Sequence, residues 1–139
     1  MSRGAEMRQL TLGVDFGTSN TAAAAFDGDR PRIILLEPGQ KTLPTAVFLD
    51  YAARRTLHGR DAVQAMIDGR YGRFMRSLKS ILGTPLARER RQFLNEKLTL
   101  LDIVARFLAE VRQRAEDETG ARIDAVVAGH AAAARVVTG

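Results

Sequence analysis

The residues of this chain best suited to chemistry form a short polar turn, Asp15-Phe-Gly17-Thr18-Ser19-Asn20, between two apolar runs. Gly17 lets the backbone approach a ligand without a Cβ in the way. Side-chain donors at Thr18, Ser19 and Asn20, with successive backbone N–H groups, suit phosphate oxygens. Asp15 could hold Mg²⁺ through its water shell, because Mg²⁺ keeps most of its waters. The hexamer alone fits a plain hairpin turn equally well.

The residues around this turn predict strands. The runs 10–16 and 21–26 flank it, and the apolar run 32–36 predicts a third strand. The four alanines within 21–26 favour a helix by propensity, but the run is short and Asp27-Gly28-Asp29 follows it as a turn. We therefore predict a meander of three antiparallel strands, with the polar turn as its first bend.

The middle of the chain predicts a loop, a strand and then mainly helix. Residues 37–45 contain two prolines and a glycine and should be a loop, and residues 46–49 a strand. From His58 to about Ile81 the pattern is mostly helical, with breaks near Gly69 and Gly72. The following Gly83-Thr84-Pro85 should end this segment.

A second helix is predicted by a cap and by its periodicity. Thr99-Leu-Leu-Asp102 resembles a capping box with Asp in place of Glu. Apolar residues then recur at three- and four-residue spacings as far as Val111, and Gly120 is a plausible C-cap. A strand over 123–128 follows. This order of elements indicates an α/β domain.

Composition narrows the chemistry further. The chain has 139 residues and no cysteine, which excludes disulfides and thiolate metal sites and fits a reducing compartment. It has no long apolar run, and the polar segment 1–9 lacks the core of a secretory signal, so we expect a cytoplasmic protein without a membrane span. His58 and His130 lie apart from other potential ligands, and we interpret both as ordinary surface or turn residues.

The net charge of +5 is concentrated in one segment. Residues 51–100 contain eleven basic and four acidic side chains. Such a segment could bind nucleic acid, an acidic partner or a polyphosphate, but a solvated helical face is the simpler interpretation. The scarcity of aromatic residues and the scattered arginines argue against nucleic acid.

Four segments together resemble the DnaK-type heat-shock chaperones. The phosphate turn resembles the first phosphate loop of the actin, sugar-kinase and heat-shock chaperone superfamily. Three later segments resemble the chaperones in the same order and at similar spacing, over about residues 10–129. These are Lys41-Thr-Leu-Pro44-Thr-Ala-Val47, His58-Gly59-Arg60-Asp61-Ala62 and Ser77-Leu-Lys79-Ser-Ile-Leu-Gly83, the last resembling a lysine-bearing helix end. The shorter YegD-like branch is the most similar.

The resemblance implies a fold and a function. The fold would be lobe I of an actin-like, ribonuclease H-like ATPase, incomplete, with a helical insertion at about 40–98. Residues 1–9 would be an overhang, 10–129 a partial nucleotide-binding domain and 130–139 an atypical tail. ATP and Mg²⁺ would be the cofactors, and unfolded polypeptides or co-chaperones would be partners of a full-length protein.

Roles follow from the resemblance residue by residue. Asp15 would organise the waters of Mg²⁺. Gly17, Thr18 and Ser19 would wrap the β- and γ-phosphates with Asn20 beside them. Lys79 would point at the γ-phosphate and the attacking water, where a cation stabilises developing charge.

The sequence departs from the family after Gly129. The second phosphate loop, a second carboxylate of the metal shell, the adenosine pocket and the second lobe have no counterpart here, so we expect the chain by itself to be inactive. Two alternatives remain. The chain could be a non-catalytic binding module that contacts an acidic partner, or a lobe of a sugar kinase or an actin-like protein.

Overall fold

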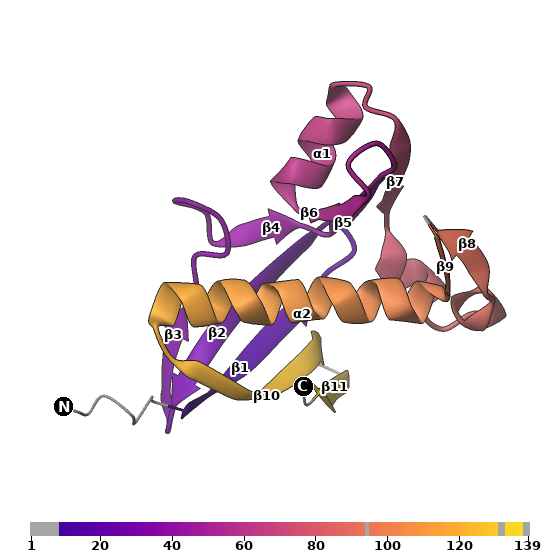
Figure 1. The fold of residues 1–139 in the computed structure, drawn as a ribbon. Coiled ribbons are helices and arrows are strands. Elements are labelled where there is room, and N and C mark those ends of the chain that lie inside the picture. Colours follow the sequence, from indigo (N-terminus) through magenta and orange to yellow (C-terminus); the bar gives the residue numbers. More distant parts are fainter. Residues whose placement is uncertain (1–8, 94, 131–132, 138–139) are drawn as a thin grey trace. The chain divides into compact units, whose positions relative to one another are not determined.

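The structure, a computed structural model, describes residues 9–93, 95–130 and 133–137. It divides into two compact units, which we describe separately (Figure 1). The first contains residues 1–16, 21–42 and 109–139, and the second contains 17–20 and 43–108. The predicted overhang 1–9 lies outside the described residues except for Gln9, which begins the first strand.

The first unit is built on a sheet of mixed direction. Its strands follow the order β11-β10-β1-β2-β3, with β1–β2, β2–β3 and β10–β11 antiparallel and β1–β10 parallel. The bounds are β1 Gln9–Phe16, β2 Asn20–Asp27, β3 Arg30–Ile33, β10 Arg122–His130 and β11 Ala133–Val137. The short strand β4, Thr42–Pro44, contains the boundary between the units.

The predicted meander is confirmed, with one shift. Residues 21–26 are extended, because their alternate residues Thr21, Ala23 and Ala25 are buried as a strand face requires. The third strand ends at Ile33 instead of Leu36. The apolar run that predicted the strand continues past its end, because Ile34 and Leu36 are buried although they lie outside β3.

The long helix α2, Leu100–Thr119, is confirmed together with both of its ends. At its start, the Thr99 N–H donates to Asp102 Oδ2 (2.8 Å) and the Asp102 N–H donates to Thr99 Oγ1 (3.1 Å), which is the predicted capping box. At its end, Gly120 adopts a φ of 68°, and its N–H donates to the Glu116 carbonyl (2.8 Å).

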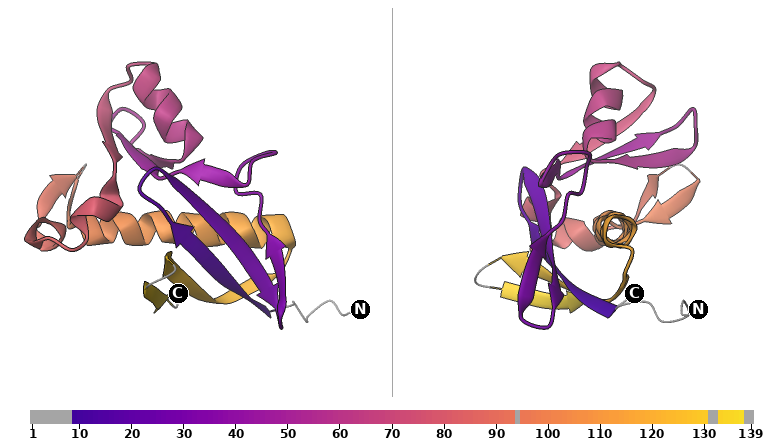
Figure 2. Two further views of the ribbon diagram at one scale, coloured as in Figure 1. Left: turned by 180° about the vertical axis from the view of Figure 1, so that it is seen from behind. Right: turned by 90° about the vertical axis from the view of Figure 1, so that its left-hand side faces the viewer.

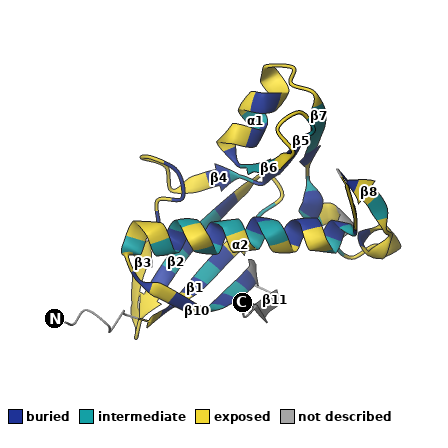
Figure 3. Cartoon of the chain, viewed as in Figure 1, coloured by how far each residue is buried: buried dark blue, intermediate teal, exposed yellow. Residues whose placement is uncertain are grey.

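The second half of α2 belongs to the first unit and lies across one face of its sheet (Figures 1 and 2). Val111 and Ala115 are fully buried on this half. Arg114 reaches the Leu36 carbonyl (3.2 Å) and the Glu37 carboxylate (3.4 Å). Buried and exposed positions alternate along the helix as an amphipathic pattern predicts (Figure 3).

The second unit contains a small sheet with the order β6-β5-β7, in which both pairs are antiparallel. The central strand β5 is buried at every residue, and helix α1 packs against it through Ala62 and Ala65. A hairpin of β8 and β9 and two short 3₁₀ turns complete the unit. The bounds are β5 Ala46–Asp50, β6 Arg55–His58, α1 Arg60–Ile67, β7 Gly72–Arg76, Leu78–Ile81 and Pro85–Arg88 (3₁₀), β8 Arg91–Phe93 and β9 Glu96–Leu98.

The prediction of a helical insertion is therefore wrong over most of its length. Among the described residues of the predicted insertion, 40–98, the α-helical ones are 60–67, and residues 72–76 form an edge strand beside β5. A Cβ at Gly72 would lie 2.1 Å from the Leu49 carbonyl oxygen, so glycine permits this close pairing. For the same reason the basic segment 51–100 is not a helical face.

Candidate phosphate-binding site

The predicted phosphate turn is a tight hairpin between β1 and β2. The N–H of Gly17 donates to the Asn20 carbonyl (3.0 Å), and the pair Phe16–Thr21 continues the ladder behind it. Thr18 and Ser19 form the tip. Both residues are exposed, as is Asn20, so their polar groups are open to a ligand.

Gly17 is required by the geometry of this hairpin. A Cβ at this position would lie 2.4 Å from the Asn20 carbonyl oxygen, closer than real Cβ contacts allow. The carbonyl belongs to the backbone, so no side-chain rotation could relieve the contact. The glycine therefore allows the turn to close.

A backbone hydrogen bond within the second unit anchors the hairpin tip. The Thr45 N–H donates to the Ser19 carbonyl (2.9 Å), and Thr45 is 1% exposed immediately before β5. Both residues belong to the second unit. Thr45 belongs to the segment 41–47 that resembles the chaperones, so this segment holds the tip in position. The strand β5 begins within the same segment, as predicted.

Asp15 lies near the end of β1. Its neighbours Val14 and Phe16 are buried, whereas Asp15 is exposed on the other side of the strand. In the ladder it pairs with Ala22 on β2 and Gly129 on β10. The sheet therefore presents one exposed carboxylate two residues before the hairpin glycine.

Lys79 lies in the last turn of a short 3₁₀ helix, Leu78–Ile81, that follows β7. A helix end is therefore present, but it belongs to this 3₁₀ turn and not to the longer helix that the sequence predicted. Ser77 precedes it with a φ of 56°, and the Ser80 hydroxyl donates to the Ser77 carbonyl (2.7 Å). Leu78 is 2% exposed and anchors the turn, while Lys79 is half-buried. The second unit contains both Lys79 and the hairpin residues Gly17–Asn20.

The structure describes the side chain of one of the two histidines. His58 ends β6 half-buried, and its ring lies edge-on to Phe107 with centroids 5.9 Å apart, so its interpretation as a surface residue is wrong. The side chain of His130 lies outside the described residues. Within 9–93, 95–130 and 133–137, no group of three or more His, Cys, Asp or Glu residues is placed to hold a metal ion.

Comparisons with known proteins relate the sequence of this chain to chaperones. No family model matches the chain. The chaperone protein DnaK of Ureaplasma parvum serovar 3 is 27% identical over 120 residues, which cover 86% of this chain and 19% of that protein. The chain is similar to DnaK-type chaperones. A chaperone protein HscA homolog of Bordetella pertussis is 31% identical over 130 residues, covering 81% of this chain and 20% of that protein.

These similarities support a relationship to the heat-shock chaperone family. The mixed α/β structure is compatible with a lobe of the ATPase domain of DnaK-type chaperones. The chain spans about a fifth of the length of the curated relatives it matches. Among the described residues, no helix combines the length and apolar character needed to cross a membrane.

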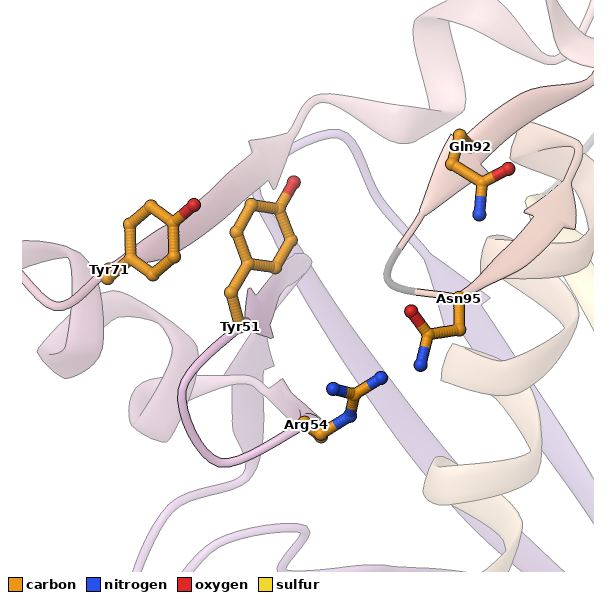
Figure 4. A pocket seen from close by; sticks show the side chains of 5 residues that line it. All are labelled: Tyr51, Arg54, Tyr71, Gln92 and Asn95. Atoms are coloured by element: carbon orange, nitrogen blue, oxygen red, sulfur yellow. The ribbon is translucent and has the colours of Figure 1, made fainter.

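An open pocket in the second unit was not predicted from the sequence. Its lining consists of Tyr51, Arg54, Tyr71, Gln92 and Asn95 (Figure 4). These residues come from three separate segments with no common motif. One signal was Tyr71, which lies between Gly69 and Gly72, where the helical pattern breaks.

Proposed function

We propose that residues 10–129 are part of the nucleotide-binding domain of an ATP-dependent heat-shock-type chaperone, with the Gly17–Asn20 hairpin as a phosphate loop. The hairpin is the main support for the proposal, because its tip exposes the hydroxyls of Thr18 and Ser19 and its tight closure requires the glycine at position 17. The similarity to two kinds of chaperone favours this function over a sugar kinase or an actin-like protein. Within the family, the motifs quoted above favour the YegD-like branch.

The residues at the hairpin fit a magnesium nucleotide. The hydroxyls of Thr18 and Ser19 and the backbone N–H groups of the tip can donate to phosphate oxygens. Mg²⁺ is commonly held by one or two carboxylates together with substrate phosphates and water. The single exposed carboxylate of Asp15 meets that need without a cluster of ligands.

Lys79 is the proposed catalytic cation. Its turn is held by the buried Leu78 and by the Ser80–Ser77 hydrogen bond, so the lysine starts from a defined backbone position. A cation aimed at the transferring phosphoryl group stabilises charge that appears in the transition state.

We expect this chain alone to bind ATP weakly and to hydrolyse it negligibly. Phosphoryl transfer depends on positioning and on electrostatics in a site that excludes water. A chain one fifth as long as its relatives supplies part of such a site. Unfolded polypeptides and co-chaperones are proposed as partners of a longer protein only.

An NMR titration of the ¹⁵N-labelled chain with Mg·ATP tests the proposal and detects weak binding. We expect saturable shifts of the Gly17, Thr18 and Ser19 amides, with the affinity reduced in Thr18→Ala. Thr11→Ala is a matched control, since Thr11 is an exposed threonine on β1, outside the hairpin tip. The absence of saturable shifts in this hairpin, or equal effects of the two variants, would contradict the proposal.

A further inference from the structure

The pocket in the second unit joins two tyrosines to three polar side chains. Its cavity of about 350 Å³ is lined on one side by Tyr51 and Arg54 from the turn between β5 and β6 and by Tyr71 just before β7. The other side is the hairpin that carries Gln92 and Asn95. The tyrosine rings meet edge-to-face with centroids 5.2 Å apart. Figure 4 shows the guanidinium of Arg54 below Tyr51, pointing toward the hairpin. All five residues belong to the second unit.

Asp50 organises the tyrosine side of the pocket. Its buried carboxylate accepts a hydrogen bond from the Ala53 N–H (3.0 Å) and forms an ion pair with Arg70. The Ala53 N–H, with a further contribution from the charge of Arg70, holds the pKa of Asp50 below its ordinary value. The Tyr51 N–H donates to the Tyr71 carbonyl (3.1 Å), so the two aromatic residues are linked through the backbone as well.

The opposite side of the pocket is attached to the same sheet. Arg73 on β7 lies over the ring of Phe93 on β8, 5.1 Å from its centroid. Phe93 is 1% exposed and follows Gln92, while Asn95 lies in the turn between β8 and β9. Both sides are therefore held in place before a ligand arrives, which reduces the entropy cost of binding.

The charges around the pocket indicate an anionic ligand. Arg70 is paired with Asp50, and Arg73 is stacked on Phe93. Arg54 is exposed, and no carboxylate of the described residues forms an ion pair with it. One guanidinium that lacks an ion pair can bind a carboxylate in a bidentate manner.

The remaining groups favour a peptide over a nucleic acid. The carboxamides of Gln92 and Asn95 each offer a donor and an acceptor, as a peptide group does. The tyrosine rings offer contact area for an apolar or aromatic side chain. Single-stranded nucleic acid instead requires a positively charged groove that follows its backbone, whereas this pocket is lined by a single cationic residue.

We propose that this pocket binds a short acidic segment of a partner polypeptide. Arg54 binds a carboxylate, Gln92 and Asn95 bind the peptide backbone, and a neighbouring apolar side chain packs on Tyr51 and Tyr71. The site uses no residue of the phosphate hairpin. Peptide binding at this pocket can therefore be confirmed or refuted independently of nucleotide binding.

Fluorescence anisotropy of the full chain with labelled hexapeptides tests this proposal. The first probe contains two glutamates beside a phenylalanine and has an amidated C-terminus, and the second replaces both glutamates by glutamine. A third probe has its only carboxylate at a free C-terminus. A comparison of the first and third probes distinguishes a side-chain carboxylate from a terminal one. Labelled hexauridine serves as the nucleic-acid probe.

The variants are Arg54→Gln and Tyr71→Ala, with Arg88→Gln as the matched control. Arg88 is an exposed arginine in the 3₁₀ turn 85–88 and does not line the pocket. We expect Arg54→Gln to weaken binding of an acidic probe by about tenfold or more, since a hydrogen-bonded charge pair is lost. Tyr71→Ala should weaken the same probe by about fivefold, and Arg88→Gln should leave its affinity unchanged.

Three results would overturn the proposal. Equal effects of Arg54→Gln and Arg88→Gln would show that the attraction is a general property of the basic surface. Equal binding of the glutamate and glutamine probes, without binding of the terminal carboxylate, would exclude carboxylate recognition. Binding of hexauridine that depends on Arg54, with no binding of the peptides, would assign the pocket to nucleic acid.

Discussion

Replacing Gly17 by alanine probes the feature on which the proposed phosphate loop depends. The new Cβ would start 2.4 Å from the Asn20 carbonyl oxygen and must move to at least 3.0 Å. That shift opens the turn at the Gly17–Asn20 hydrogen bond, which is itself 3.0 Å long. Overpacking of this kind costs about 1–3 kcal/mol, and the loss of one hydrogen bond adds about 1 kcal/mol.

Urea unfolding followed by far-UV circular dichroism measures this cost, since the chain has no tryptophan. The total cost is about 2–4 kcal/mol, so a urea dependence of about 2 kcal/mol per molar implies that Gly17→Ala lowers the midpoint by about 1–2 M. Gly83→Ala is the control, because no atom lies within 4 Å of a Cβ at that position and its φ is not in the left-handed region. We expect Gly83→Ala to leave the midpoint close to that of the unmodified chain.

The same two variants test whether the closed Gly17–Asn20 hairpin is needed for the proposed binding of phosphate. We expect Gly17→Ala to remove the Mg·ATP-dependent shifts at the hairpin and Gly83→Ala to retain them. Equal urea midpoints for the two variants would refute the steric argument. A Gly17→Ala chain of reduced stability that still binds Mg·ATP normally would refute the role of the closed hairpin in phosphate binding.

Three further predictions concern other parts of the chain. Thr99→Ala should lower the free energy of unfolding by about 1 kcal/mol, because α2 loses its cap. The depressed pKa of Asp102, caused mainly by the hydrogen bond from the Thr99 N–H, stabilises the fold above the ordinary pKa of aspartate, and this stabilisation is lost as the pH falls through the depressed value. The loss on acidification should be smaller in Thr99→Ala, because the Thr99 side chain also lowers the pKa of Asp102. Unfolding measured at neutral pH and at pH about 3 tests this, and equal losses in the two chains would contradict it. Phe107→Ala should cost about 3–5 kcal/mol, since the ring is fully buried, and an unchanged urea midpoint would contradict this. In a protein extended to the length of its relatives, Lys79→Ala should slow single-turnover hydrolysis by about a hundredfold with little change in ATP affinity, whereas Thr18→Ala should weaken both; equal losses of rate and affinity in Lys79→Ala would contradict its role.

Local chemistry explains which elements could be predicted. The Gly17–Asn20 turn, the Thr99–Asp102 cap and the Gly120 terminus each depend on residues within a few positions of one another. Polar side chains, hydrogen bonds to nearby backbone and the conformational freedom of glycine act at that range. For that reason the β1–β2 hairpin and both ends of α2 were confirmed.

The alanine-rich strand β2 shows how a sequence argument can override propensity. Its residues favour a helix individually, but the turn at 27–29 leaves too short a segment for one. The alternating burial in β2 is consistent with the extended prediction. Periodicity and turn residues were more informative here than composition.

The second unit depended on tertiary structure. Residues 72–76 lack the alternation of a half-buried strand, and only the buried β5 provides a partner for their backbone groups. The segment 55–58 is short and largely polar, and it too becomes a strand by pairing with β5. The sequence predicted helix over this region because it does not show that the backbone of β5 is available to pair with these segments.

The sequence by itself determined the Gly17–Asn20 hairpin and the long capped helix, because each depends on residues close together along the chain. It also determined the resemblance to DnaK-type chaperones, which rests on short local motifs. Only the tertiary structure decided the pocket around Arg54. Its tyrosines and carboxamides come from segments about twenty residues apart, brought together by strand pairing with β5 and by Arg73 on Phe93. The physical reason is that long-range pairing depends on which surfaces remain to be buried, and that is a property of the whole fold.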